Sequence, residues 1–194
     1  MHLKVNLIKK NKSIKGFTLI ELLVVLTISA ILMTLAMPSM RQFIGNWQTS
    51  NAVNALIGTL QLARSEAIKR GRTVRVCNTN NGTSCFVGSN IGNGGWKSGW
   101  IAYVDNDASG TTVTAGDEII LVQNRFTYMT DITSNENSSF AFTPAGLMQN
   151  AVGSQKINFN WDSAATIHKG LCISFTGRAR VVADNSDCSG AGNN

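Results

Sequence analysis

A long uncharged segment near the N-terminus constrains this chain more than any other feature. Residues Leu22–Met40 contain no Asp, Glu, Lys or Arg, and Leu, Ile, Val, Met and Ala dominate the stretch. As a helix, Phe17–Met37 would measure about 31 Å, close to the thickness of the hydrocarbon core of a bilayer. The residues before it are polar and basic. This pattern predicts a membrane-spanning helix with the basic end in the cytoplasm and the rest of the chain outside it.

The positive charge of the chain is concentrated in that basic leader. The whole sequence has 17 Lys and Arg against 11 Asp and Glu, a net charge of +6. Removing the leader lysines leaves 12 basic against 11 acidic residues, or +1; these are Lys4, Lys9, Lys10, Lys12 and Lys15. If the leader is removed, an acidic partner therefore has to be held by a local patch, because the protein has no strong overall field.

Glu21 is the feature that ordinary targeting segments do not explain. A secretory signal peptide would have a shorter apolar core and a small-residue cleavage site beyond it. A plain signal anchor needs no acidic residue. Glu21 lies inside the apolar run, one helical turn from Phe17, where a carboxylate is costly and usually functional. The alternative is an interfacial glutamate at the membrane edge.

The segment Gly16-Phe17-Thr18-Leu19-Ile20-Glu21, with its basic leader and long apolar helix, resembles the processing motif of type IV prepilins and type II secretion pseudopilins. The resemblance implies that a prepilin peptidase cuts after Gly16 on the cytoplasmic side and N-methylates Phe17. It also implies that Glu21 pairs with the N-terminal amine of a neighbouring subunit. A buried carboxylate needs such a partner in hydrocarbon.

The helical pattern continues well beyond the apolar run. Pro38 is expected to kink the helix rather than end it. Gly71 is a plausible stop signal, so we expect one helix from about Phe17 to Arg70. Spacings of three and four residues predict an apolar stripe that packs under a sheet, formed by Val53, Leu56, Leu60, Ala63 and Ala67.

From Thr73 onward the sequence consists of short apolar runs separated by Gly, Asn, Asp and Ser. The connections are too short for crossover helices, so these runs predict an antiparallel sheet. The expected strands are Thr73–Cys77, Trp100–Val104, Glu118–Gln123, Ser139–Phe142, Lys156–Trp161 and Leu171–Val182.

The order of several short segments also resembles the GspH/FimT group of pseudopilins and minor pilins. These segments are Leu62–Ala67, Gly99–Asp105, Gly116–Glu118, Thr143–Gly146 and Ile173–Arg178. The resemblance implies an α+β, type IV pilin-like fold: a long N-terminal helix, transmembrane in its first half, packed on an antiparallel β-sheet domain. The expected organisation is a leader over residues 1–16, a transmembrane and filament-core helix over 17–45, and a globular domain over 46–194 whose helical part extends to about residue 70.

No catalytic arrangement is present in the sequence, so we expect neither an enzyme nor a cofactor. Outside the leader, His168 is the one histidine, and the HExxH, GxSxG and P-loop motifs are absent. Gly94–Ser98 is interpreted as a surface loop. Asp105–Gly110 resembles the start of a calcium loop, but Gly116 occupies the position of the bidentate glutamate. We therefore expect an Asx-rich turn there and no metal site.

Four cysteines outside the leader permit three disulfide pairings. An extracytoplasmic location allows oxidation, and the CxxC spacing typical of zinc sites is missing. We expect the two local pairs, Cys77–Cys85 and Cys172–Cys188, each of which would tie a strand to an adjoining loop or tail.

Two arginines near the C-terminus are candidates for binding DNA. Strand alternation would place Arg178 and Arg180 on one face, with Lys169 preceding the same strand. Such a line of cations suits a phosphate backbone, and these residues resemble a GRxR-like element of DNA-binding FimT-type pilins. The alternatives are a solvated strand face or an ion pair between Arg178 and Asp184.

Together these features predict a minor pilin that polymerises through its N-terminal helix and helps to prime or cap a type IV pilus. The alternatives are a type II secretion pseudopilin of the GspH type and a DNA-binding pilus subunit of natural transformation. The resemblance implies other pilins or pseudopilins, the prepilin peptidase and an inner-membrane assembly platform as partners. The expected location is the bacterial inner membrane with a periplasmic C-terminal domain, and then an extracytoplasmic filament.

Overall fold

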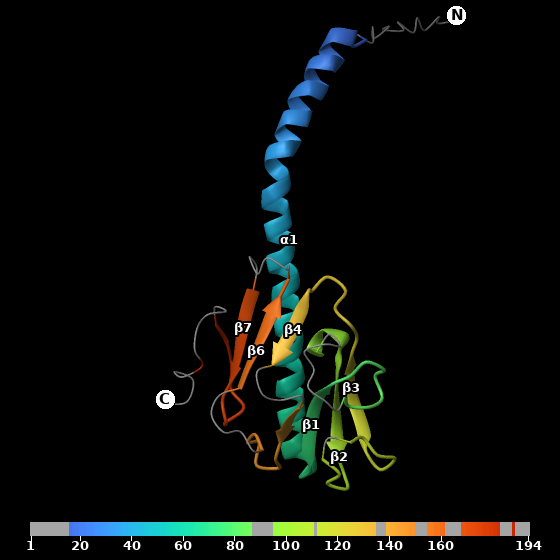
Figure 1. Ribbon diagram of the computed structural model, residues 1–194, viewed down its shortest axis with the longest axis vertical. Coiled ribbons are helices and arrows are strands. Elements are labelled where there is room, and N and C mark those ends of the chain that lie inside the picture. Colours follow the sequence, from blue (N-terminus) through green and yellow to red (C-terminus); the bar gives the residue numbers. More distant parts are fainter. Residues whose placement is uncertain are drawn as a thin grey trace, which may run out of the picture. The chain divides into compact units, whose positions relative to one another are not determined.

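The computed structural model describes residues 16–86, 95–110, 112–134, 139–149, 155–161, 168–182 and 188 (Figure 1). The chain divides into two compact units, Met1–Arg41 and Gln42–Asn194. Helix α1, Leu19–Arg70, belongs to both units, so each part is described within its own unit.

In the N-terminal unit, α1 begins just after Thr18. The hydroxyl of Thr18 accepts a hydrogen bond of 3.3 Å from the amide of Glu21, which is the geometry of a helix N-cap. The helix continues through Pro38 without ending there. The large apolar side chains from Phe17 to Met33 are 46–83% exposed, so the described residues of this unit do not cover them.

No described helix is by itself long and apolar enough to span a membrane. The segments Leu19–Thr34 and Ser39–Arg70 meet the criteria of length and composition only when they are taken as a pair.

In the C-terminal unit, α1 supplies one wall of the hydrophobic core. Every residue of the predicted stripe, from Val53 to Ala67, is at most 2% exposed, which confirms the periodicity argument. The helix ends at Arg70, and Gly71 follows with φ of 63°. That left-handed conformation suits glycine and is typical of the residue after a helix.

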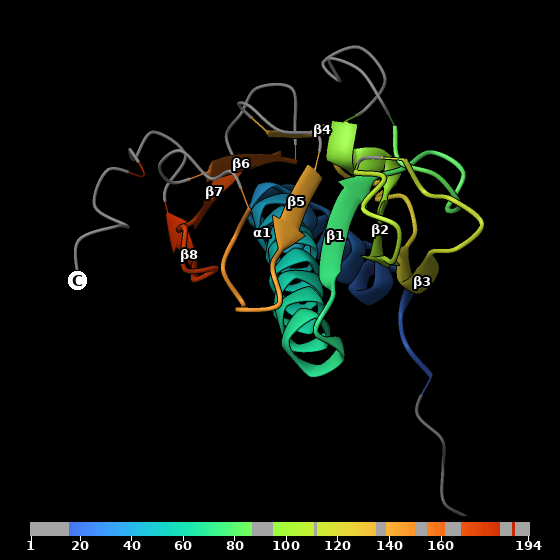
Figure 2. The same cartoon turned by 90° about the horizontal axis from the view of Figure 1, so that it is seen from below.

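Within the described residues, eight strands form two antiparallel four-stranded sheets. The first sheet has the order β3-β2-β1-β5, with β1 Thr73–Asn78, β2 Trp100–Asp105, β3 Glu118–Gln123 and β5 Ser139–Phe142. Figure 2 shows the strands of both sheets around the helix.

The second sheet has the order β4-β6-β7-β8. Its strands are β4 Asp131–Ser134, β6 Gln155–Asn160, β7 His168–Ile173 and β8 Ala179–Val182. The sequence predicted one antiparallel sheet. The strands are antiparallel as predicted, but the described strands form two sheets.

The predicted single strand Leu171–Val182 is in fact a hairpin. β7 ends at Ile173, and the chain reverses before β8 begins at Ala179. The amide of Gly177 donates to the carbonyl of Ser174 at 2.8 Å, and Gly177 has φ of 76°. A glycine that can adopt positive φ permits this tight turn, and the apolar residues on either side had suggested an unbroken strand.

The segment around Trp96, which was expected to be a surface loop, is partly helical and buried. Gly95–Ser98 forms a short 3₁₀ helix, and Trp96 is 1% exposed. Its ring centroid lies 5.2 Å from that of Phe140 and 6.2 Å from that of Trp100. The large apolar area of an indole outweighs the polar composition of its neighbours and brings this segment into the core.

Hydrogen bonds attach the helix to both sheets. The hydroxyl of Thr59 accepts from the indole nitrogen of Trp100 in β2, and Arg70 binds Glu118 in β3. On the other side, Gln48 accepts from the indole of Trp161, directly after β6, at 2.6 Å. Lys169 in β7 donates to Ser50 at 2.7 Å. These contacts fix the helix at the junction of the two sheets.

Candidate functional site

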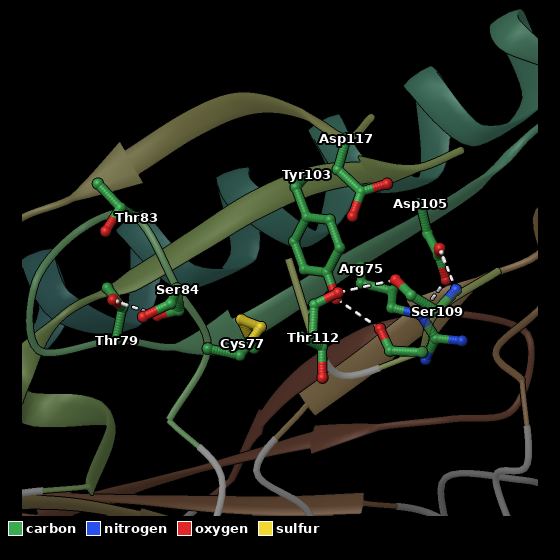
Figure 3. The surroundings of a disulfide bond; sticks show 12 residues. Arg75, Cys77, Thr79, Thr83, Ser84, Tyr103, Asp105, Ser109, Thr112 and Asp117 are labelled. Carbon is green, nitrogen blue, oxygen red and sulfur yellow. Dashed lines mark hydrogen bonds and ion pairs between the residues drawn. A yellow bond between two sulfur atoms is a disulfide. The ribbon is translucent and has the colours of Figure 1, made fainter. Parts of the chain in front are cut away.

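The outer face of the first sheet carries a small second core built around a disulfide (Figure 3). Cys77 in β1 is joined to Cys85, and Cys77 packs with Ile101 and Tyr103 of β2. The phenol of Tyr103 donates to the carbonyl of Gly110 at 2.6 Å, and burial raises the pKa of this phenol above its usual value. The disulfide and this hydrogen bond hold two loops against the sheet, which explains why Ile101 and Tyr103 on the outer face of β2 are buried.

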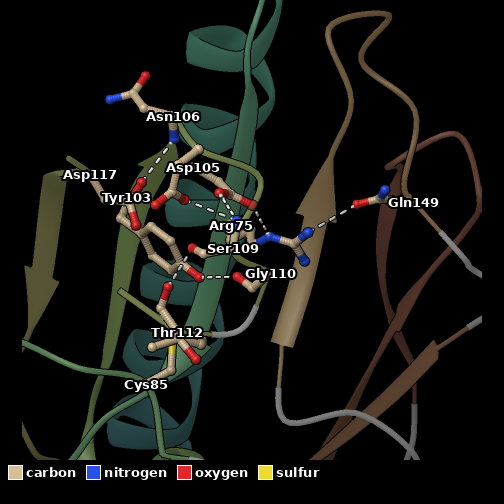
Figure 4. A network of polar contacts seen from close by, with 12 residues as sticks. Arg75, Cys85, Tyr103, Asp105, Asn106, Ser109, Gly110, Thr112, Asp117 and Gln149 are labelled. Atoms are coloured by element: carbon tan, nitrogen blue, oxygen red, sulfur yellow. Dashed lines mark hydrogen bonds and ion pairs between the residues drawn. A yellow bond between two sulfur atoms is a disulfide. The ribbon is translucent and has the colours of Figure 1, made fainter. Parts of the chain in front are cut away.

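Three carboxylates lie together at the end of β2 and in its connection to β3. Figure 4 labels two of them, Asp105 and Asp117. Oxygens of Asp105, Asp107 and Asp117 lie within 4.8 Å of one another. Asp105 accepts from the Nε of Arg75 at 2.7 Å and from the amide of Ser109 at 3.0 Å.

The other two carboxylates of this group also have donors from the chain itself. Asp117 accepts from the amides of Asn106 and Thr114, and Asp107 accepts from the hydroxyl of Thr114 and the amide of Ser109. The hydroxyl bond from Thr114 is the largest cause of a lowered pKa at Asp107. These bonds organise the Asx-rich turn.

The second disulfide joins Cys172 in β7 to Cys188. Both local pairings expected from the sequence are therefore present in the structure. In register, Cys172 lies opposite Arg180 of β8, so the disulfide is attached to the strand pair that carries the candidate DNA-binding arginine.

The structure does not bring the three candidate DNA-binding cations into one line. Arg178 lies in the turn before β8, and Arg180 lies within β8; both are exposed. Lys169 and Cys172 are three residues apart on β7, so their side chains point to opposite faces of the sheet. The ammonium group of Lys169 donates to Ser50 of the helix. Lys169 thus faces α1, whereas Arg180 is paired with Cys172 on the opposite face. Asp184 lies outside the described residues.

A second basic site lies where the β7–β8 turn meets the helix. A pocket of about 420 Å³ is lined by Arg64 and Gln61 of α1 and by Gly177 and Arg178 of the turn, with Leu60 and Ala179 at its apolar side. Sequence reasoning did not single out Arg64 as a functional residue, because the contact of the helix with this turn joins segments that are distant in sequence.

The residues of the expected processing site lie at the start of the described chain. Gly16 and Phe17 precede α1, and Phe17 is 83% exposed. Glu21 lies in the first turn of the helix and is exposed. Within the described residues its carboxylate has no cationic partner.

Comparison with known protein families identifies the globular part of the chain. The family described as Type II transport protein GspH matches residues 52–177, which is more than half of the sequence. The chain belongs to the GspH family. The prokaryotic N-terminal methylation motif matches residues 11–37. Membership in the GspH family, together with this motif, indicates a type IV pilin-like, membrane-anchored extracytoplasmic protein that assembles with other pilins or pseudopilins.

Two crystal structures of the type IV minor pilin FimU from Pseudomonas aeruginosa strain PAO1 are similar to this GspH-family chain. Each is 18% identical in sequence. The crystal form in space group P65 covers 69% of this chain and 91% of its own, with a TM-score of 0.48. The form in space group P21 covers 72% and 92%, with a TM-score of 0.49. No curated protein matches the sequence.

Proposed function

We propose that this chain is a minor pilin that enters a type IV pilus through its N-terminal helix and helps to prime or cap the filament. The observation that carries the proposal is the exposed apolar surface of the N-terminal unit, where large side chains from Phe17 to Met33 are 46–83% exposed. Twelve such residues exposed to water would be unfavourable by about 1.5–3 kcal/mol for each side chain left unburied. Lipid, and then the helices of sister subunits, can cover this surface.

Glu21 gives this helix a way to recognise its neighbours. Its carboxylate has no partner among the described residues, and it lies one turn from Phe17. Cleavage after Gly16 would create a positively charged amine on Phe17. That amine on one subunit and Glu21 on the next would neutralise each other in a non-polar filament core.

In this account the leader keeps the precursor in the inner membrane until the prepilin peptidase removes it. The assembly platform then transfers the subunit from the membrane into the filament, and the globular domain remains outside the membrane. The test is a deletion of the gene with complementation by the full chain. We expect fewer surface pili in the deletion strain and the protein in the sheared filament fraction of the complemented strain. Normal pilus number together with absence from that fraction would contradict the proposal.

A type II secretion pseudopilin is the second candidate, favoured by the description of the matching family. The same helix and the same Glu21 would serve a short filament in a secretion system. The deletion strain separates the two candidates, because loss of exoprotein secretion with normal surface pili identifies a secretion role. Loss of pili with normal secretion identifies a pilus role.

A DNA-binding role in natural transformation is favoured by Arg178 and Arg180, two exposed cations without an acidic partner in the described part of the chain. Contacts to phosphate alone would give weak binding without sequence preference, with Kd values of about 10⁻⁴–10⁻⁶ M at physiological salt. Replacing both arginines by Gln should then abolish most of the binding in a fluorescence-anisotropy titration of the full chain in detergent. Unchanged binding would exclude these residues.

A further inference from the structure

Arg64 lies beside two glycine turns. A Cβ atom at Gly146 would lie 3.2 Å from the Nε of Arg64, and one at Gly177 would lie 3.6 Å from its Cδ. Both glycines have positive φ, 73° and 76°. The amide of Met148 donates to the carbonyl of Phe175 at 3.0 Å, which joins the segments that contain the two turns. Arg64 therefore lies close to both turns, and it lines the same pocket as the second of them.

Arg64 shares its pocket with a second cation, Arg178. The described residues give neither guanidinium an acidic partner. The nearest acid along the helix, Glu66, is already bound to Arg70 and Lys69. Two like charges in one pocket repel each other, and an anion between them would relieve that repulsion.

The pocket also carries groups that distinguish between anions. Gln61 adds an amide donor, and Ala179 adds apolar surface to the lining of the pocket. Arginine binds planar carboxylates through two parallel hydrogen bonds, and an aliphatic stem can cover neighbouring apolar surface. A phosphodiester of duplex DNA would leave that surface exposed. The combination suits the side chain of a glutamate or aspartate.

We propose that the pocket between Arg64 and Arg178 binds an acidic side chain of a neighbouring pilin-family subunit in the filament. The contact would fix the rotation of the globular domain relative to its neighbour, whereas Glu21 acts in the filament core. The inference rests on the proposed function, because it requires this chain to be part of a filament.

The test is zero-length cross-linking in assembled filaments. Arg178→Lys in the full chain keeps the positive charge and supplies an amine, which a water-soluble carbodiimide couples only to a carboxylate in direct contact. Arg180→Lys is the matched control, since Arg180 is two residues away, exposed and not part of the pocket lining. We expect mass spectrometry to find a link from position 178 to an Asp or Glu of another subunit, at several-fold higher yield than from position 180.

Equal yields at positions 178 and 180, or no link to another subunit in filaments that contain the variant, would overturn the inference while leaving the proposed function intact. Absence of both variants and of the wild-type chain from filaments would refute the proposed function, and the subunit contact with it. In a second arm, the full chain in detergent is titrated with a duplex oligonucleotide. Loss of DNA binding in Arg64→Gln would instead assign the pocket to nucleic acid and overturn the inference.

Discussion

The indole nitrogen of Trp100 donates a hydrogen bond of 2.9 Å to the hydroxyl oxygen of Thr59, and both residues are buried. The bond joins β2 to α1 across 41 residues of sequence. It satisfies a donor that has no access to water, and it fixes the rotation of the helix against the first sheet. The position of the helix is therefore set by a specific polar contact as well as by its apolar stripe.

Replacing Thr59 by Val should destabilise the globular domain by about 1–3 kcal/mol, because the shape is kept while the buried indole donor loses its acceptor. Thr49→Val is the matched control: Thr49 is equally buried, but its hydroxyl donates only to the carbonyl of Gly45 in the same helix. The control substitution should lower the free energy of unfolding by less than about 1 kcal/mol. Chemical unfolding of the full chain in detergent, followed by tryptophan fluorescence, measures both. Equal effects would show that the bond contributes nothing specific.

The stability of the domain should fall in acid because of Arg70, which binds both Glu66 and Glu118. Hydrogen bonds from this guanidinium lower the pKa of each carboxyl below the usual 4.5. The unfolded chain then takes up these protons first as the pH decreases. The stabilisation is complete above 4.5 and is lost as the pH falls through the lowered pKa values of the folded state.

Thermal unfolding midpoints of the wild type and of Glu118→Gln between about pH 7 and pH 3 test this expectation. The variant should have a slightly lower midpoint at neutral pH and a shallower decline in acid, because one of the two lowered carboxyl pKa values is removed. Glu118 is largely exposed, so high salt should reduce the difference. Parallel curves for the two proteins would contradict the assignment.

The local structure of this protein was largely predictable from its sequence, because local patterns determine it. The stripe from Val53 to Ala67 follows helical periodicity, and β3 and β5 have the bounds that the alternation predicted. By contrast, β4 was missed, because in the segment Asp131–Ser134 only Ile132 is buried and a single apolar residue gives no alternation.

The division into two sheets and the pocket at Arg64 depend on contacts between distant segments. The turn at Gly177 separates β7 from β8, yet its neighbours Phe175 and Val181 are apolar and look like a continuous strand. The sequence grouped Lys169 with Arg178 as a candidate DNA-binding residue, whereas in the structure Lys169 donates a hydrogen bond to Ser50 of the helix. Alternation gives the two faces of a strand, but it does not tell which face the helix will cover.

Mass spectrometry of unreduced peptides should find the links Cys77–Cys85 and Cys172–Cys188. Each bond closes a short loop and should stabilise the domain by about 2.5–3 kcal/mol in the chain-entropy model. Cys188→Ser should lower the free energy of unfolding by that amount at most. Free thiols in protein secreted through the native pathway, or a Cys77–Cys188 link, would contradict the structure.

Gly16→Val should block maturation of the chain. We expect the β-branched side chain to crowd the peptidase at the bond between Gly16 and Phe17, so the precursor would keep its five leader lysines and remain in the membrane. Immunoblotting of membrane fractions distinguishes the precursor from the shorter mature form. Mature-sized product from this variant would show that the cut lies elsewhere.

The most direct test of the account is the incorporation of a Glu21→Ala variant into filaments, with Glu21→Gln as the variant that keeps the size of the side chain. Cleavage acts on the Gly16–Phe17 bond, so both variants should be processed to the mature length. We predict that both are nearly absent from the sheared filament fraction while the wild-type chain is present at the same expression level. Normal incorporation of the processed Glu21→Ala protein would contradict the claim that this helix assembles through its carboxylate.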